Sequence, residues 1–259
     1  MLVNRKYFSK FYALGPLAAV FVAWELAALN SEVIELFIPP PSKFFPPLVS
    51  MFLDGIMPLA IYNTLRKAFH SYSMALATAI PIGVLLGWKS SVYKIFEPIV
   101  EALRPIPSIA LIAPAIIFFG LGDNSVQFVA YYAVFWVMFI NSLYGIYGVD
   151  KLAMMAFRSM HAKDRDIFLK LMLPSALPFI FAGMRQALAV SMIVTVAGEM
   201  IAGSRGLGYF LLESERSFHY ESVYAALIVL SFLGYLLNRV FLTFEGKVLK
   251  WTKETTPVT

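Results

Sequence analysis

The chain has 259 residues, of which 59% are hydrophobic and 14% are charged, and its formal net charge is +5. Soluble domains carry roughly 25% charged residues, and the mean hydropathy of +0.73 leaves apolar material for several membrane spans. We therefore predict an all-α, polytopic membrane protein. The positive charge does not indicate nucleic-acid binding, because it lies in loops between apolar runs. The sequence has no cysteine, which excludes disulfides and thiolate metal sites.

The amino end is basic and is followed by an apolar stretch, residues 11–29, that only Glu25 interrupts. A secretory signal peptide has the same order of charge and hydrophobicity. This stretch is long for a signal peptide, however, and no small-x-small cleavage site follows it. We therefore predict an uncleaved first span with the amino end in the cytoplasm.

Residues 30–57 break the apolar pattern with three consecutive prolines at 39–41. Proline fixes its own φ and disfavours helix at the residue before it, so this run predicts extended structure. Ser42 is a suitable N-cap for a short helix that starts at Lys43. The stretch is expected to form an interfacial loop outside the membrane.

Five further apolar stretches follow, and with the first they predict six transmembrane helices; the five cover residues 63–88, 106–120, 126–149, 176–202 and 223–244. The stretch at 106–120 is short and contains Pro114, which neighbouring helices must accommodate. Since no soluble domain interrupts these spans, residues 1–259 are predicted to form one transmembrane domain.

The distribution of lysine and arginine predicts the orientation. With six spans and the amino end inside, the inner segments hold fifteen basic residues: Arg5, Lys6, Lys10, Lys89, Lys94, Arg104, Lys151, Arg158, Lys163, Arg165, Lys170, Arg239, Lys247, Lys250 and Lys253. The outer segments hold five: Lys43, Arg66, Lys67, Arg205 and Arg216. Cytoplasmic loops are enriched in basic residues, so both termini are predicted to be cytoplasmic.

Residues 150–174 form the longest polar interruption in the apolar body of the chain, and five of them are basic. The apolar spacing predicts two short amphipathic helices with a break near His161 and a stop at Leu173-Pro174. Such a loop between two spans is either a docking surface for a soluble partner or a solvated loop that satisfies the positive-inside rule.

The chain has no phosphate-binding loop, no nucleophile elbow and no pair of carboxylates close together in a polar segment. We therefore predict that it is not an enzyme. Two charged residues lie in the predicted fifth span, Arg185 toward its inner end and Glu199 toward its outer end. Intramembrane charges are candidates for a translocation pathway. Otherwise, Glu199 is a buried structural carboxylate bonded to a neighbouring span, and Arg185 extends to the interface.

The segment 150–174 also resembles the cytoplasmic loop of ABC importer permeases, which has the pattern E-A-A-x3-G-x9-I-x-L-P. Ala156, Leu173 and Pro174 match this pattern, and Leu171 is a conservative match; Met155 and Phe157 occupy the other two E-A-A positions, and His161 stands at the glycine. Three flanking segments closely resemble the nitrate, sulfonate and taurine branch of these permeases: FIPPPSKFFPPL, EPIVEALRPIPSIALIAPAIIFFGLGD and LPSALPFIFAGMRQALAVSMIVTVAGEMIAGSRGLGYFL.

This resemblance, which covers nearly the whole chain, implies the type I ABC importer architecture and a permease in the cytoplasmic (inner) membrane. Residues 150–174 would be the coupling loop that docks on a cytoplasmic ATPase dimer, with Phe168 in the interface. ATP and magnesium would bind to the ATPase, with no cofactor on this chain. A second permease copy, identical or related, and an extracytoplasmic solute-binding protein would complete the complex, and membrane lipid would surround it.

The departures from the pattern bear on coupling. Met155 in place of the glutamate implies a more apolar contact with the ATPase, and His161 in place of glycine makes a left-handed turn costlier. Either the ATPase groove differs to suit a homodimer, or this chain is the weaker-docking half of a heterodimer. The residues leave two other classes open: a channel or ion-coupled secondary transporter that needs no ATPase, and a membrane scaffold that transports nothing.

Overall fold

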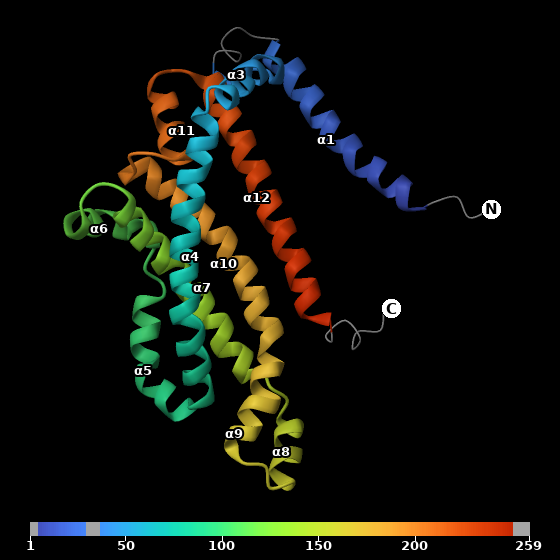
Figure 1. The fold of residues 1–259 in the computed structure, drawn as a ribbon, viewed down its shortest axis with the longest axis vertical. Helices are drawn as coiled ribbons and strands as arrows, with labels where there is room; N and C mark the ends of the chain where they lie inside the picture. The colour runs from blue at the N-terminus through green and yellow to red at the C-terminus, as the bar shows by residue number, and fades with distance from the viewer. Residues whose placement is uncertain (1–4, 30–36, 251–259) are drawn as a thin grey trace. The chain divides into compact units, whose positions relative to one another are not determined.

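The structure is a computed structural model that describes residues 5–29 and 37–250, and every regular element in these two ranges is helical (Figure 1). Part of the predicted interfacial loop, residues 30–36, lies outside the described residues, as does Lys253. The contacts group the chain into two compact units. The first unit comprises residues 1–60 and 210–231, and the second comprises residues 61–209 and 232–259.

The first unit holds α1 (Arg5–Leu29) and α3 (Pro41–Leu53), together with parts of the helices α4 (Ile56–Trp88), α11 (Leu207–Arg216) and α12 (Tyr220–Val248). The prediction that Ser42 caps a helix from Lys43 is wrong: the helix begins at Pro41, since proline has a helical φ and needs no N–H partner in the first turn. Ser42 instead donates its hydroxyl to Glu25 of α1 at 2.6 Å.

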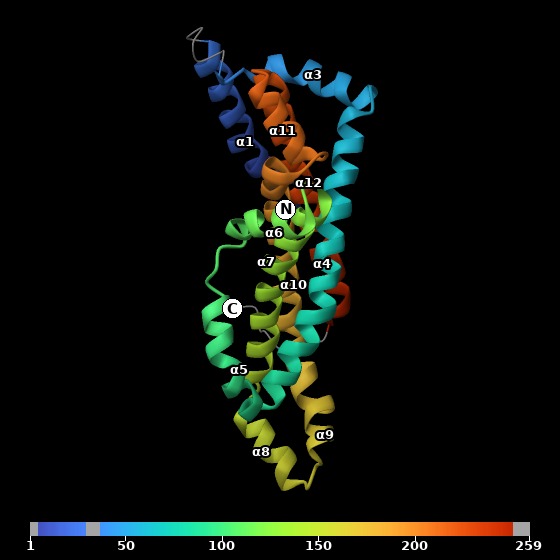
Figure 2. The same cartoon turned by 90° about the vertical axis from the view of Figure 1, so that its left-hand side faces the viewer.

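The remaining helices lie wholly or largely in the second unit, except α11 (Leu207–Arg216) and the first part of α12 (Tyr220–Val248). They are α4 (Ile56–Trp88), α5 (Ser90–Leu103), η1 (Ser108–Leu111), α6 (Ile112–Phe119), α7 (Asp123–Tyr147), α8 (Lys151–Ser159), α9 (Asp164–Ile167), η2 (Phe168–Met172) and α10 (Leu173–Ala202). Helices α7 and α10 are antiparallel and pack along most of their length (Figure 1, Figure 2).

Four helical stretches in the described part of the chain are long and apolar enough to cross a membrane, residues 56–88, 123–147, 164–202 and 220–248. They contain the predicted second, fifth and sixth spans and most of the fourth. A shorter apolar helical stretch, Ala18–Leu29, overlaps the predicted first span. The total of six spans remains a prediction.

The predicted third span, 106–120, is not one straight helix. Pro105 and Pro107 remove two backbone donors and bias the residues before them away from helix. The chain therefore leaves the helical conformation after α5 and resumes it as η1 and α6. With eight residues, α6 is about 12 Å long, too short to cross a bilayer. Helix α5 and η1–α6 together qualify as one span that is bent by 80°.

Small residues bring α4 and α7 close together. A Cβ on Gly83 would lie 2.7 Å from the carbonyl oxygen of Phe139, and one on Gly87 would lie 2.9 Å from the Cβ of Ile146. Close backbone approach of this kind is a common basis of helix association in membranes. Polar bonds add to it, since the Ser71 hydroxyl donates to the Gln127 carbonyl of α7 at 3.0 Å.

We predict that Gly83→Ala destabilises the protein by about 1–3 kcal/mol, because its methyl group overlaps the backbone of α7. Gly234→Ala in α12 is the matched control, since a Cβ there meets nothing within 4 Å and alanine favours helix by up to about 1 kcal/mol. The measurement is the thermal unfolding midpoint in detergent. Equal midpoints for the two variants would contradict this account of the packing.

Candidate functional site

The antiparallel pair α7 and α10 places two functional candidates at its opposite ends. The segment 150–172 connects the carboxyl end of α7 to the amino end of α10, and the glycine-rich segment 203–208 follows the other end of α10, where α7 begins (Figure 1).

At the first end, α8 is a short helix whose two ends are both fixed by hydrogen bonds. Asp150 is its N-cap and accepts a bond from the Leu152 amide at 3.0 Å. At the other end, the Ala162 amide donates to the Phe157 carbonyl at 3.1 Å and the His161 amide donates to the Arg158 carbonyl at 2.9 Å. This pair of bonds is a Schellman motif. Helix α8 is therefore a defined element rather than an open loop.

The Schellman motif requires a left-handed residue just past the helix, and His161 takes that place with φ of 57°. The predicted break near His161 is confirmed. A Cβ makes the left-handed conformation costly by about 1–2 kcal/mol. The backbone of His161 therefore has a conformation that would suit the glycine of the family pattern better.

The predicted stop at Leu173-Pro174 is wrong, because the chain continues as one helical stretch from Asp164 to Ala202. The π-helical turn η2 lies directly before the proline, and the Leu173 amide donates to the Phe168 carbonyl five residues back. The widened turn carries the helix past a residue that has no N–H. As a result, α9, η2 and α10 form one continuous rod from the loop into the apolar body.

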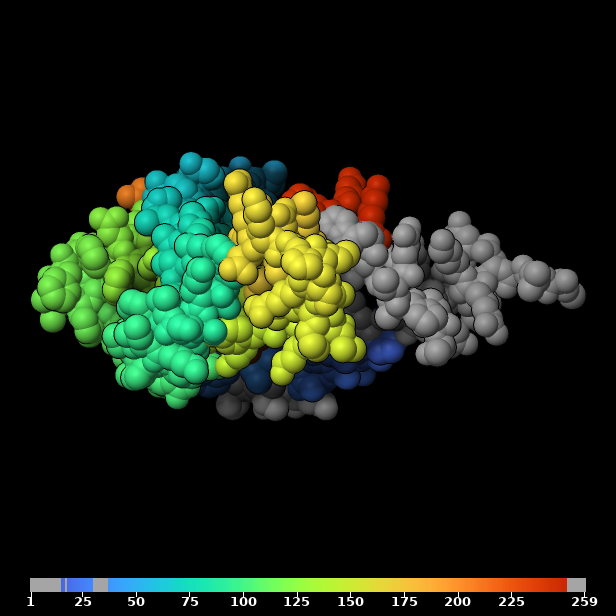
Figure 3. Space-filling model, turned by 90° about the horizontal axis from the view of Figure 1, so that it is seen from below, coloured from blue at the N-terminus to red at the C-terminus, as the bar shows by residue number. Residues whose placement is uncertain are grey.

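Residues 150–174, the predicted coupling loop, are called the coupling segment from here on, and their side chains divide into an outer and an inner set. Leu152, Met155 and Met160 are 71%, 56% and 68% exposed, and Ala156 and Pro174 are also exposed. Phe157, Phe168, Leu171 and Leu173 are half-buried and pack against the core. Seen from this end of the molecule, α8 and α9 form an outer surface (yellow in Figure 3).

Phe168 belongs to the inner set because its ring stacks on Trp88, the last residue of α4, with the centroids 4.5 Å apart. The Lys89 ammonium lies 4.4 Å from the centre of the same Trp88 ring. Phe168 thus joins the coupling segment to the end of α4, and the surface that it offers to another protein is small.

At the other end of α10, Glu199 is fully buried and forms an ion pair with the equally buried Lys67 of α4 at 2.8 Å. Lys67 has two further acceptors, the Asp123 carboxylate at 3.3 Å and the Arg205 carbonyl at 2.6 Å. Asp123 also pairs with Arg66. An isolated charge is costly inside a membrane protein, and here each buried charge has an opposite charge and neutral partners.

Neutral donors complete the surroundings of the Glu199 carboxylate. The Thr64 hydroxyl donates to it at 2.8 Å, and the Gly208 amide donates to it at 2.9 Å. The Thr64 oxygen also accepts a bond from the Leu207 amide at 2.8 Å. We call Thr64, Lys67, Asp123 and Glu199, with the segment 203–208, the buried charge cluster.

The cluster explains two of the glycines in the segment 203–208. A Cβ on Gly206, whose φ is +117°, would overlap the Glu199 carboxylate, and a Cβ on Gly208 would overlap the Val196 carbonyl. Without side chains at these positions the backbone comes close enough to bond to the carboxylate.

Arg185 lies apart from this cluster. Its side chain is 46% exposed, and its guanidinium is 3.8 Å from the Glu245 carboxylate of α12. Arg185 and Glu199, the two pathway candidates, are therefore in different surroundings: one is partly open and weakly paired, and the other is enclosed. In the described part of the chain, no group of His, Cys, Asp or Glu residues is suited to hold a metal ion.

Thr64, Lys67 and Asp123 are not among the site residues predicted from the sequence. The prediction places Lys67 in an outer segment, whereas α4 begins at Ile56 and buries this residue. A usable signal existed, because Lys67 shares a helix face with small or hydroxyl residues at helical spacing: Ala60, Thr64, Ser71 and Ala75.

We predict that Glu199→Gln or Lys67→Met destabilises the protein by about 3–5 kcal/mol, because each change leaves a buried charge without its opposite charge. The double variant should cost less than the sum of the two single changes. Arg185→Gln, which removes a half-exposed charge, is the control and should cost about 0–1 kcal/mol. Thermal unfolding in detergent measures all four variants, and additive costs would contradict direct pairing.

We also predict that His161→Gly makes the coupling segment up to about 1 kcal/mol more stable, because glycine adopts the left-handed conformation without a Cβ clash. The rate of tryptic cleavage at Arg158, Lys163 and Arg165 reports local opening of this segment. His161→Ala, which keeps the Cβ, is the control. Faster cleavage in the glycine variant than in the unmodified protein would refute this reading of the turn.

Comparison with known proteins extends this picture. Residues 79–250 match the sequence profile of the family described as the binding-protein-dependent transport system inner membrane component. A putative ABC transporter permease of Methanocaldococcus jannaschii is 31% identical over 244 residues, 91% of this chain and 90% of that protein. The taurine transport system permease of Escherichia coli is 28% identical over 247 residues, 93% of this chain and 90% of that protein.

Other matching relatives are named as nitrate import permeases, of Leptolyngbya laminosa and a Synechocystis strain, and as a putative aliphatic sulfonates permease of Bacillus subtilis. In fold, the chain is similar to a solved structure of the MetNI methionine ABC transporter in an inward-facing conformation. The TM-score is 0.65 at 20% identity, over 76% of this chain and 96% of that chain.

The all-α architecture predicted from the sequence is therefore confirmed, as is the resemblance to the nitrate, sulfonate and taurine branch. In this family the ATPase is a separate subunit and a substrate-binding protein is a further partner. The chain belongs to the family of binding-protein-dependent transport system inner membrane components, and it is the permease subunit of an ABC importer.

Proposed function

We propose that this permease imports a small anion of the nitrate, taurine or sulfonate class and that the exposed face of α8 docks it on a cytoplasmic ATPase dimer. The proposal that α8 docks on the ATPase rests on the exposed apolar side chains of the coupling segment. Leu152, Met155 and Met160 are large apolar side chains that the described part of the protein leaves more than half exposed. An apolar surface on a capped helix is suited to a partner groove.

The rod formed by α9, η2 and α10 supports the mechanical side of this proposal. A push on α8 reaches α10 through a turn that is closed by the Schellman motif and through an unbroken helix. Because packed helices move as stiff bodies, displacement at the coupling segment is passed to the spans. The stacking of Phe168 on Trp88 supports a second route, from the segment to the end of α4.

The family pattern has a glutamate where this chain has Met155. With a half-exposed methionine there, we propose that docking depends on apolar contact and that the ATPase groove facing it is correspondingly apolar. The ATPase would bind ATP and magnesium. The permease would act as a dimer, with an identical copy preferred over a related one, in contact with membrane lipid and with both termini in the cytoplasm.

The substrate class rests on the relatives, which include permeases for taurine, nitrate and aliphatic sulfonates. Of the two pathway candidates, we retain Arg185, whose guanidinium is partly open. For Glu199 we propose a structural role, because its carboxylate is enclosed and bonded to Lys67, Thr64 and Gly208.

We predict that the triple variant Leu152→Ala, Met155→Ala and Met160→Ala retains at most about a tenth of the ATPase that co-purifies with the unmodified chain. Removing three exposed apolar anchors should lower affinity by well over about 1.4 kcal/mol. The measurement is affinity purification from the native membrane in mild detergent, followed by mass spectrometry.

Met74→Ala is the matched control, since Met74 is 49% exposed but lies on α4, away from α8. It should leave the ATPase bound. Full retention of the ATPase by the triple variant would exclude this face as the docking surface. A second, related permease among the recovered proteins would replace the homodimer with a heterodimer.

A further inference from the structure

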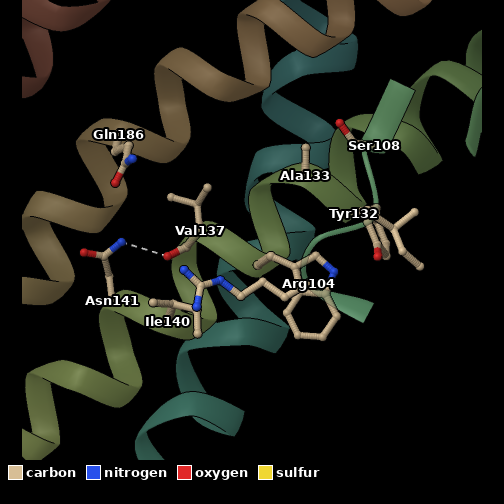
Figure 4. A pocket seen from close by; sticks show the side chains of 10 residues that line it. Arg104, Ser108, Tyr132, Ala133, Val137, Ile140, Asn141 and Gln186 are labelled. Atoms are coloured by element: carbon tan, nitrogen blue, oxygen red, sulfur yellow. Dashed lines mark hydrogen bonds between the residues drawn. The ribbon is translucent and has the colours of Figure 1, made fainter. Parts of the chain in front are cut away.

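The second unit contains a cavity of about 460 Å³ that lies between the bend after α5, the middle of α7 and α10 (Figure 4). Its size is in the range of small-ligand sites. The bend contributes Arg104, Ile106 and Ser108, and α10 contributes Gln186; α7 contributes the remaining wall with Tyr132, Ala133, Trp136, Val137, Ile140 and Asn141.

The lining of this cavity suits an anion. Arg104 is the one charged residue among those that form the wall, and no carboxylate accompanies it. Figure 4 shows its side chain extending along α7 toward Asn141, with Gln186 facing the same space from α10. No carboxylate in the described residues lies within 4.0 Å of the Arg104 guanidinium, whereas Arg66, Lys67 and Arg185 each have one.

The position of Arg104 adds a second argument. The sequence prediction places Arg104 in an inner segment, whereas it is the first residue of the break between α5 and η1–α6, which together form the bent candidate span. Ionisable residues within spans are expensive and mark substrate paths by default, and broken spans are typical places for solute sites. The Arg104 side chain is exposed and has no carboxylate partner in the described residues, so its charge is available to an anion in the cavity.

The hydrogen-bonding state of the wall indicates which groups are available. The Tyr132 hydroxyl already donates to the Leu103 carbonyl at 2.5 Å, and the Asn141 amide donates to the Val137 carbonyl at 2.8 Å. The Trp136 indole N–H, in contrast, is buried without a hydrogen-bond partner. Because buried donors are nearly always bonded, a polar ligand atom in the cavity would satisfy it.

We propose that this cavity binds the acid group of a small nitrate-like or sulfonate anion during import; the proposal rests on the function proposed above. The planar guanidinium of Arg104 presents two parallel N–H groups to two oxygens of the anion. The Trp136 N–H and the Gln186 amide supply neutral donors, and the aromatic rings of Tyr132 and Trp136 contribute apolar wall beside them.

The test uses the purified permease–ATPase complex and three probes: sodium nitrate, sodium methanesulfonate and dimethyl sulfone, the last being close in size to methanesulfonate but uncharged. The readout is tryptophan fluorescence. Both anions are expected to give a saturable change that Trp136→Phe abolishes, although three other tryptophans remain. Arg104→Gln should raise the half-saturating anion concentration by about ten- to hundredfold, and Arg104→Lys should raise it less.

Arg216→Gln is the control for charge alone, because Arg216 is exposed and lies on α11, outside the cavity wall. It should leave the anion response unchanged. An equal response to dimethyl sulfone, or an unchanged half-saturating concentration in Arg104→Gln, would overturn the proposal, as would the absence of any saturable response.

The two proposals fail in different ways. The Arg104 variants should still co-purify with the ATPase, since the cavity does not include α8. Loss of anion binding with the ATPase still bound therefore supports the cavity site. If the ATPase does not co-purify with the unmodified chain, the proposed docking is refuted. An anion response of the purified chain alone would still support the cavity site.

Discussion

The ion pair between Lys67 and Glu199 is the constraint on which the arrangement of the second unit depends. Both side chains are fully buried, and taking two charges out of water is repaid only by close pairing and by bonds to the remaining polar atoms. Those bonds come from Thr64 on the same helix as Lys67, from Asp123 at the start of α7 and from the backbone after α10. One pair of charges therefore fixes the mutual positions of α4, α7 and α10 at this end.

The opposite ends of the same helices are held differently. There the contacts are aromatic and apolar, as in the stacking of Phe168 on Trp88, and the outer face of α8 is exposed. Apolar contacts are non-directional and tolerate sliding, whereas a buried ion pair with several hydrogen bonds has one good geometry. The physical contrast favours motion at the coupling segment about a fixed region near Glu199. A rod from Asp164 to Ala202 joins the two.

The elements that the sequence predicts well are those governed by composition. Apolar length places the predicted spans 126–149, 176–202 and 223–244 on the helices α7, α10 and α12, whose bounds differ from the prediction by a few residues. The break near His161 follows from the apolar spacing. The errors arise where a local rule competes with tertiary context. Proline in Leu173-Pro174 was expected to end a helix, but a π-helical turn before it keeps the helix continuous. Lysine is normally solvated, so the sequence places Lys67 in an outer segment. Its burial is favourable because of the ion pair with Glu199, which lies 132 positions further along the chain.

The same electrostatic reasoning separates the arginines of the second unit. Arg66 and Arg185 each have a carboxylate within 4.0 Å, which weakens their attraction for a passing anion. Arg104 has none in the described residues and stands at a bend whose prolines prevent the helix from continuing. A bend exposes backbone groups that need polar surroundings, and a cavity next to it supplies the space. An importer of anions needs an attraction that is strong enough to admit the solute and weak enough to release it. A single guanidinium at this bend meets that requirement better than the tightly bonded Lys67 does.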